Sequence, residues 1–178
     1  MERLDIEKCL ESMSVLIDTR EQPSERANRR YADFPCPCRR QTLDYGDYTF
    51  NFVLPDGTEY FQPTDKAAGV AIIERKMDLA ELSNCLTHDR KRFVAEMERA
   101  QQHSAKIYLL VEDANWENLI NGRYRTKFNP KSYFASITAF MARYDVTPIF
   151  CKQETSGKLI YQVLYRELKE RLERGDYG

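Results

Sequence analysis

Residues 70–76 read VAIIERK, in which four apolar residues, three of them β-branched, lead directly into a glutamate, an arginine and a lysine. A short apolar run of this kind indicates a buried strand. Successive side chains of a strand point to opposite faces, so Glu74 and Lys76 are expected on one face and Arg75 on the other. The end of this strand would therefore present a carboxylate and an ammonium at one point.

Two further acidic residues are expected at or near strand ends. Asp18 follows the apolar run Val15–Ile17, and Asp47 follows Gly46. Glycine permits a sharp turn and the close approach of a ligand. Open α/β sheets present their ligands at strand ends, so the two aspartates and Glu74 are expected to share one cleft. The competing interpretation is that the aspartates are turn residues and that the charges after the strand are merely solvated.

Three carboxylates and a lysine in one cleft would suit phosphodiester hydrolysis. That reaction needs a hard divalent cation, held by carboxylates, to polarise the phosphoryl oxygen and to activate water. A nearby positive charge then helps to stabilise the transition state. The spacing of the residues permits such a site without proving it.

The whole chain alternates expected strands with expected helices. Strands are predicted at 15–18, 39–43, 48–54, 58–62, 70–76, 107–111 and 146–150, and helices at 1–12, 22–30, 78–86, 89–102, 116–120, 133–144 and 159–172. This alternation predicts the α/β class with a mixed central β-sheet.

Local signals add detail to this order of elements. Segment 22–30 is polar and arginine-rich, and Pro23 suits a first helical turn, so a short exposed helix is expected there. The strands on either side of residues 44–47 are expected to meet at a tight bend. Pro-Asp-Gly at 55–57 predicts the turn of a hairpin, and 63–69 is expected to be a loop.

Composition limits the functional classes. With 178 residues and 42% hydrophobic residues, the chain is expected to form a single domain over 1–178, with its core at about 14–174. A net charge of −1 gives no global attraction to DNA, so DNA binding would need a local basic face. Five cysteines without paired spacing favour a reducing, cytoplasmic compartment, and no apolar segment is long enough to cross a membrane. The pair Cys36 and Cys38 is interpreted as two incidental thiols in a turn.

Four ordered motifs carry a resemblance to a known family. They are VLIDTREQ at 15–22, GDY at 46–48, IIERK at 72–76 and DRKRF at 89–93. Together they resemble the nuclease domain of the XPF family of structure-specific endonucleases, whose signature is Gly-Asp, a variable spacer and Glu-Arg-Lys. The resemblance extends from about residue 15 to the final helix. It implies a restriction-endonuclease-like mixed central β-sheet flanked by helices.

The resemblance also implies roles for individual residues. Asp18, Asp47 and Glu74 would hold Mg²⁺ or Mn²⁺, and Lys76 would lie beside the attacking water and the scissile phosphate. The residues implied to support the site are Arg20, Glu21 and Arg75. Arg75 is expected to be structural, because strand alternation turns it away from Glu74 and Lys76.

The sequence departs from the family pattern in two respects. Ala80 stands where the family usually has an aspartate, four residues after the lysine, and Asp78 or Glu81 could substitute for it. The chain ends at Gly178 without room for the helix-hairpin-helix module that commonly follows, so DNA would have to be gripped by other means. Those means could include a partner subunit.

Two basic segments are candidates for DNA contact. Arg90, Lys91 and Arg92 lie near the start of a predicted helix, where phosphates can meet side chains and helix amides. The loop that follows the 116–120 helix interleaves basic and aromatic residues, and its candidates are Arg123, Arg125 and Lys127. The alternative for both segments is an ordinary solvated surface.

The prediction is a metal-dependent endonuclease that cuts branched or structured DNA in repair or recombination, associated with the nucleoid if the host is bacterial or viral. The alternative is a non-catalytic DNA-binding or scaffolding module on the same fold. A third interpretation, an enzyme for small phosphate esters, lacks a glycine-rich phosphate loop. Family likeness and an apolar stripe in the helix at 133–144 predict a homodimer that uses the last two long helices.

Overall fold

The computed structural model describes residues 1–60 and 70–177 of the chain. Its described strands form one seven-stranded sheet in the order β2-β1-β3-β5-β6-β7, with β4 paired to β3. The strands are β1 (Ser14–Asp18), β2 (Cys38–Gln41), β3 (Tyr48–Val53), β4 (Glu59–Tyr60), β5 (Ala71–Lys76), β6 (Lys106–Glu112) and β7 (Thr147–Cys151). The helices are α1 (Arg3–Glu11), α2 (Glu25–Ala32), α3 (Leu79–Leu86), α4 (Arg90–Gln102), α5 (Trp116–Ile120), α6 (Pro130–Tyr144) and α7 (Ser156–Arg174), with a short 3-10 helix at Gln153–Thr155.

The sheet is mixed, as predicted. Strand β3 runs antiparallel to β1 and β5, whereas β1 with β2, β5 with β6, and β6 with β7 are parallel pairs. Residues 71–74 of β5 are all buried because strands lie on both sides of β5 and helices cover both faces of the sheet. This is why the segment reads as a continuous apolar run rather than an alternating one.

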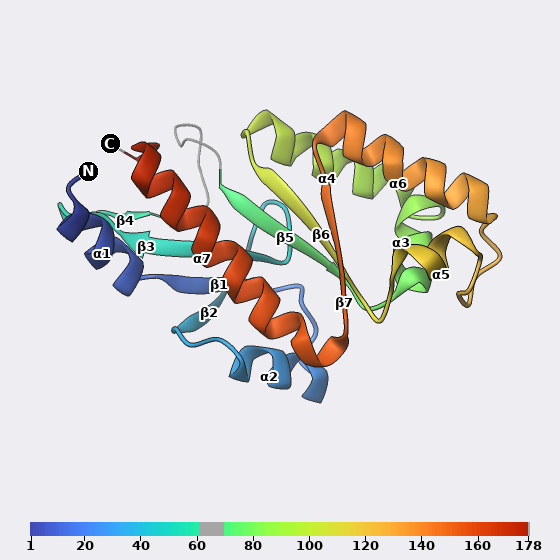
Figure 1. Ribbon diagram of the computed structural model, residues 1–178, viewed down its shortest axis with the longest axis horizontal. Helices are drawn as coiled ribbons and strands as arrows, with labels where there is room; N and C mark the ends of the chain where they lie inside the picture. Colours follow the sequence, from blue (N-terminus) through green and yellow to red (C-terminus); the bar gives the residue numbers. More distant parts are fainter. Residues whose placement is uncertain (61–69, 178) are drawn as a thin grey trace.

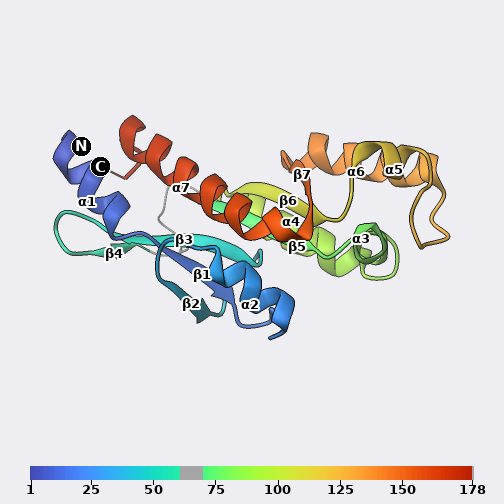
Figure 2. The same ribbon diagram turned by 60° about the horizontal axis from the view of Figure 1, so that its bottom comes forward.

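Each face of the sheet carries its own core. On one face, Ile72 packs with residues of α3, α4 and α6, among them Leu82, Phe93 and Phe140. On the other face, Ile73 packs with residues of α1 and α7. Figure 1 shows α7 lying across the strands, and Figure 2 shows the two chain ends close together beside α1 and α7.

Two expectations for the first half of the chain need correction, and a third can be compared with the structure only in part. Strands β2 and β3 do not meet at the 44–47 bend, because β1 lies between them and pairs with both. Helix α2 begins at Glu25, one residue after the capping Ser24, and is not simply exposed, since Arg30 is buried. The hairpin is confirmed for β4, whereas residues 61–62 of the expected strand and the expected loop at 63–69 fall outside the described residues.

Helix starts follow local capping chemistry. The Asp78 side chain accepts a hydrogen bond from the Glu81 amide at 2.8 Å and caps α3, as its sequence predicts. Helix α6 begins at Pro130, three residues earlier than expected, because Asn129 caps it and proline suits a first helical position. No helix among the described residues is both long and apolar enough to span a bilayer.

Candidate active site

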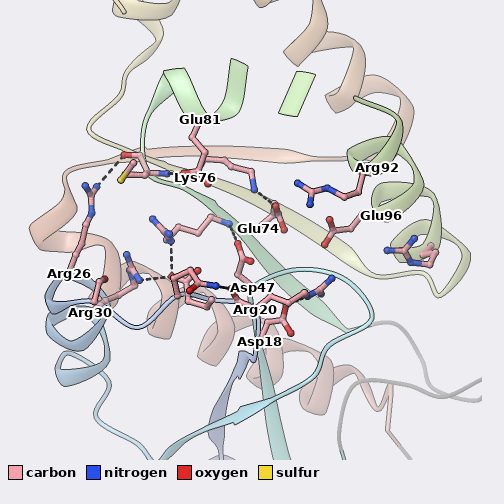
Figure 3. Close-up of a pocket in the computed structure, with 16 residues that line it drawn as sticks. Asp18, Arg20, Arg26, Arg30, Asp47, Glu74, Lys76, Glu81, Arg92 and Glu96 are labelled. Carbon is pink, nitrogen blue, oxygen red and sulfur yellow. Dashed lines mark hydrogen bonds and ion pairs between the residues drawn. The ribbon is translucent and has the colours of Figure 1, made fainter. Parts of the chain in front are cut away.

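All seven residues predicted for the catalytic site line one cavity of about 430 Å³ (Figure 3). The end of β5 forms its centre, the end of β1 and the 44–47 turn lie on one side, and α2 and α4 flank it. The seven are Asp18, Arg20, Glu21, Asp47, Glu74, Arg75 and Lys76. The strand ends therefore share one cavity, while convergence on a metal-sized site and the chemical roles of these residues remain predictions.

Glu74 and Lys76 form a buried ion pair on one face of β5. The Lys76 ammonium also lies 5.6 Å from the centre of the Phe93 ring. Burial by itself would lower the pKa of Lys76, but the negative charges of Glu74 and Asp47 raise it above its ordinary value. Lys76 is therefore a cation in this pocket. Burial raises the pKa of Glu74, although the charge of Lys76 opposes that shift.

Asp47 links the ends of two strands. Its amide donates to the Ile73 carbonyl at 2.9 Å, and its carbonyl accepts from the Asp18 amide at 2.8 Å. Its carboxylate accepts from the Arg75 amide at 2.7 Å. Burial, followed by the charge of Glu74, raises the pKa of Asp47 to about 8. The fold therefore holds the Asp47 carboxyl near the charge of Glu74 and removes part of its hydration. Both effects disfavour the ionised form of Asp47.

The turn that delivers Asp47 requires glycine. Gly46 has φ +73°, in the left-handed region that side chains disfavour. A Cβ atom at this position would lie only 3.0 Å from Cδ1 of Ile72. Any other residue would be strained at this φ, and either Ile72 or the turn would have to shift to make room for its Cβ atom.

Asp18 is buried and both of its carboxylate oxygens have partners. Oδ2 forms an ion pair with Arg20, and Oδ1 accepts from the Leu43 amide at 3.2 Å. Arg20 also donates to the Leu43 carbonyl at 2.8 Å. Asp18 therefore stabilises a turn, as the competing interpretation of the sequence expected, and it also lines the cavity.

Arg75 points away from Glu74 and Lys76, as alternation predicts, and enters a network of buried ion pairs. It lies 3.2 Å from Glu21 and 3.3 Å from Glu112. Arg30 bridges the same two carboxylates, at 3.0 and 3.2 Å. Arg26 is a third arginine in contact with Glu112, at 2.5 Å. This network joins α2 to the ends of β5 and β6, and Glu21, Arg26, Arg30 and Arg75 line one wall of the cavity.

The donor chemistry fits Mg²⁺ or Mn²⁺, since hard divalent cations prefer carboxylate oxygens. Their arrangement is not that of a ready site, because within residues 1–60 and 70–177 no group of three or more His, Cys, Asp or Glu side chains is placed to hold a metal ion. Lys76 pairs with Glu74, and Arg20 pairs with Asp18. Cation binding would have to loosen both pairs.

The structure separates the predicted DNA contacts. Arg92 is exposed and lines the cavity. Arg90 instead lies 5.6 Å from the centre of the Phe140 ring and donates to the Leu86 carbonyl, so it contributes to packing. Lys91 is exposed and is not among the residues that line the cavity. In the 121–130 loop, Arg123 and Arg125 line a separate cavity of about 260 Å³, and Lys127 is exposed.

Several cavity residues were missed from the sequence, chiefly Arg26, Arg30, Glu96 and Arg99. Arg92, Glu96 and Arg99 share one face of α4, since residues three and four apart are neighbours on a helix. Once Arg92 had been identified as a candidate, this helical spacing could have indicated Glu96 and Arg99 as well. Of the two acids considered as substitutes at Ala80, Glu81 lines this cavity, whereas Asp78 caps α3 and lines the separate one.

The fold is similar to that of XPF from Aeropyrum pernix. One solved chain matches with a TM-score of 0.61 and 16% identity, covering 92% of this chain and 69% of its own. A second, in complex with DNA, matches with a TM-score of 0.60 and 19% identity, covering 89% of this chain and 66% of its own. This chain thus spans about two thirds of each XPF chain. The expected restriction-endonuclease-like fold is confirmed.

No curated protein sequence matches this chain at a significant level. The family model of the ERCC4 domain, however, matches residues 17–163. That match runs from β1 into α7 and contains all seven predicted catalytic residues. The chain belongs to the ERCC4 domain family.

Proposed function

We propose that the chain is a Mg²⁺- or Mn²⁺-dependent DNA endonuclease that hydrolyses phosphodiester bonds in branched or otherwise structured DNA during repair or recombination. The observation that supports this most is that Asp47, Glu74 and Lys76 meet in one cavity of an ERCC4-family chain. One of the similar XPF structures is a complex with DNA, which supports nucleic acid as the substrate class.

Each residue has a distinct part in the proposed reaction. A bound divalent cation would supply Lewis acidity and lower the pKa of a water molecule. Asp47 and Glu74, assisted by Asp18, would hold that cation through carboxylate oxygens. The raised pKa of Lys76 keeps it charged, so its ammonium can stabilise negative charge that develops on the phosphate.

Exposed arginines at the cavity edge support phosphate binding. The side chains of Arg20 and Arg92 are 57% and 79% exposed at the cavity edge, so a DNA backbone could reach both, although Arg20 is paired with Asp18 and Arg92 with Asp89. Arg99 is also exposed and lines the cavity. Because the net charge of the chain is −1, this local cluster would have to supply the attraction to DNA.

The runner-up is a non-catalytic DNA-binding or scaffolding module. Ala80 in place of the usual aspartate, and the absence of an assembled metal group among the described residues, both favour it. Glu74 is buried and Asp47 is partly buried, and such a module would have no evident reason to keep both carboxylates in one cavity, because removing carboxylates from water is costly.

The deciding experiment incubates the chain with labelled flaps, forks, junctions and linear duplex, in Mg²⁺, in Mn²⁺ or in chelator. We expect cleavage of at least one branched substrate with metal and none in chelator. The matched control is Asp47→Asn, which keeps the side-chain shape and should be inactive. DNA binding without cleavage in either metal would favour the scaffolding module.

We also infer that a second copy or a partner subunit supplies further DNA-binding surface, because the candidate contacts found here are few. A reducing, intracellular compartment is proposed because all five cysteines are free.

A further inference from the structure

Helix α4 holds the turn that carries Asp47. Oε1 of Glu96 accepts a hydrogen bond from the Gly46 amide, with an N–O distance of 2.9 Å. Arg99, three residues further along, donates to the Asp44 carbonyl at 3.3 and 3.4 Å. These side chains share one face of the helix. Helix α4 therefore holds the backbone of the turn at both Asp44 and Gly46.

The Gly46 amide has a particular need for this partner. Gly46 is buried, and an unpaired buried amide is costly. The backbone at Gly46 is in the left-handed region and lies close to Ile72, so the turn has little room to move toward β5. Glu96 supplies an acceptor from the opposite side. The carboxylate of Glu96 therefore satisfies the amide immediately before Asp47.

Asp47 itself is fixed only on its strand side by the contacts described above. Its main chain bonds to β1 and β5, and its carboxylate accepts from the Arg75 amide. Releasing Gly46 would free the preceding peptide, and the position of the Asp47 carboxylate relative to Glu74 would become less well defined. Such a loss of position matters in an active site, where a displacement of about 1 Å can lower the rate on the order of a hundredfold.

We propose that Glu96 is a positioning residue, whose carboxylate holds the Gly46 amide and thereby fixes Asp47 opposite Glu74. The proposal rests on the proposed nuclease function for its effect on rate, but not for its effect on the turn. Glu96 lies in none of the family motifs quoted above.

A direct role for the charge of Glu96 is the main competing explanation. Figure 3 shows Glu96 beside Glu74 at the cavity wall. The two roles need different atoms, because positioning needs only an acceptor oxygen whereas a direct role needs the negative charge. Glutamine keeps the acceptor and loses the charge, and alanine loses both. The pair Glu96→Gln and Glu96→Ala therefore separates the two roles.

The experiment compares these variants with Glu98→Ala, an exposed residue of the same helix that does not line the cavity. Amide hydrogen exchange of Gly46, measured by NMR in metal-free protein, reports on the turn. Single-turnover cleavage reports on Asp47. In Glu96→Ala we expect Gly46 exchange to accelerate by about tenfold or more, in line with the loss of one hydrogen bond. Cleavage should slow by roughly ten- to a hundredfold. Glu96→Gln and Glu98→Ala should stay within about threefold of the parent in both measurements.

Three outcomes would overturn the proposal. The first is unchanged Gly46 exchange in Glu96→Ala. The second is an equal acceleration at the Leu110 amide in β6, which would mean general unfolding rather than release of the turn. The third is cleavage in Glu96→Gln as slow as in Glu96→Ala with normal Gly46 exchange, which would assign the effect to charge. If the parent chain cuts no DNA, the nuclease function fails separately, and the exchange data alone decide whether Glu96 holds the turn.

Discussion

Individual charges in the cavity are balanced in different ways. Glu74 has Lys76, and Asp18 has Arg20, each as an ion-pair partner. Asp47 accepts from a backbone amide, and its pKa of about 8 reflects burial and repulsion by Glu74. The negative charge of Asp47 is therefore costly in the metal-free protein.

This imbalance predicts a pH effect on the stability of chelator-treated protein. The pKa of Asp47 rises from its ordinary value of 3.8 to about 8 on folding, so between these values the folded chain keeps a proton that the unfolded chain releases. The contribution to stability is then complete at the acid end of this window and is lost as pH rises through the upper value. The melting temperature should fall across the window, and Asp47→Asn should flatten that fall. Parallel melting profiles for parent and variant would refute the assignment.

Loss of Lys76 should slow cleavage much more than it weakens DNA binding, and it should also lower the melting temperature, because the buried Glu74 carboxylate loses its ion-pair partner. Lys76→Ala removes the positive charge that would stabilise the phosphate in the transition state, and a loss of at least roughly a hundredfold in single-turnover rate is expected. Asp47→Asn should abolish cleavage by weakening metal binding. Cleavage, fluorescence-monitored DNA binding and thermal melting should be measured on the same preparations. An unchanged rate in either variant would remove that residue from the catalytic site.

At the scale of elements, helix α2 is tied to the sheet by charge rather than by an apolar stripe. Burial alone would raise the pKa of Glu112, but a hydrogen bond from Ser156 and the charges of Arg30 and Arg75 lower it. Glu112 is fully buried at the end of β6. It is therefore an anion that joins α2, β5 and the start of α7.

Breaking this network at Glu112 should destabilise the fold. Glu112→Gln removes one of the two carboxylates that Arg30 and Arg75 share and leaves them with Glu21, and a loss of about 3 kcal/mol in the free energy of unfolding is expected, as for other buried pairs that lose one member. The control is Glu25→Gln, in an exposed pair with Arg29 whose side chains are 92% and 77% exposed, where a loss of at most about 0.5 kcal/mol is expected. Urea denaturation measures both, and equal losses would contradict the prediction.

At the scale of the whole molecule, a net charge of −1 means that DNA binding would depend on a local basic surface, and the surface proposed here is the cavity edge. We expect weak, salt-sensitive binding, because only a few basic residues can neutralise phosphates. Arg92→Ala should reduce the slope of log affinity against log salt by about one, whereas Lys91→Ala, outside the cavity lining, should leave it unchanged. Fluorescence anisotropy in chelator at several salt concentrations measures this slope. Equal slopes for both variants would show that the cavity edge does not bind DNA.

The homodimer expected from the last two long helices remains a prediction. Most of the apolar stripe that was expected to form its interface is not available on the surface. Most of the apolar stripe of α6 packs into the core of the same chain, where Tyr133, Ile137, Phe140 and Tyr144 are buried. Phe134 is 38% exposed and packs edge-on against Trp116.

If these helices form a dimer, Phe134→Glu should weaken it, because a charge would enter the apolar contact. Light scattering over a concentration series measures the molecular mass of parent and variant. A parent chain that stays monomeric at high concentration would end the dimer prediction.

The sequence by itself determined the order and type of the elements. Buried strands such as 70–76 and helix caps such as Asp78 depend on periodicity and on local hydrogen bonding, which are properties of neighbouring residues. Alternation along β5 also determined that Glu74 and Lys76 share a face that Arg75 does not. The other predicted catalytic residues had different sources, since Asp18 and Asp47 stand at or near expected strand ends and the family resemblance implied Arg20 and Glu21.

Only the tertiary structure decided which distant residues complete the site. Gly46 and Glu96 are fifty residues apart in the sequence, and Arg30 and Glu112 are eighty-two apart, yet each pair is in hydrogen-bond contact. The placement of β1 between β2 and β3 likewise follows from burying β1 on both edges, which no local pattern encodes. A contact of this kind depends on how strands and helices pack in three dimensions, so the sequence pattern could supply the catalytic candidates but not the residues that hold them in position.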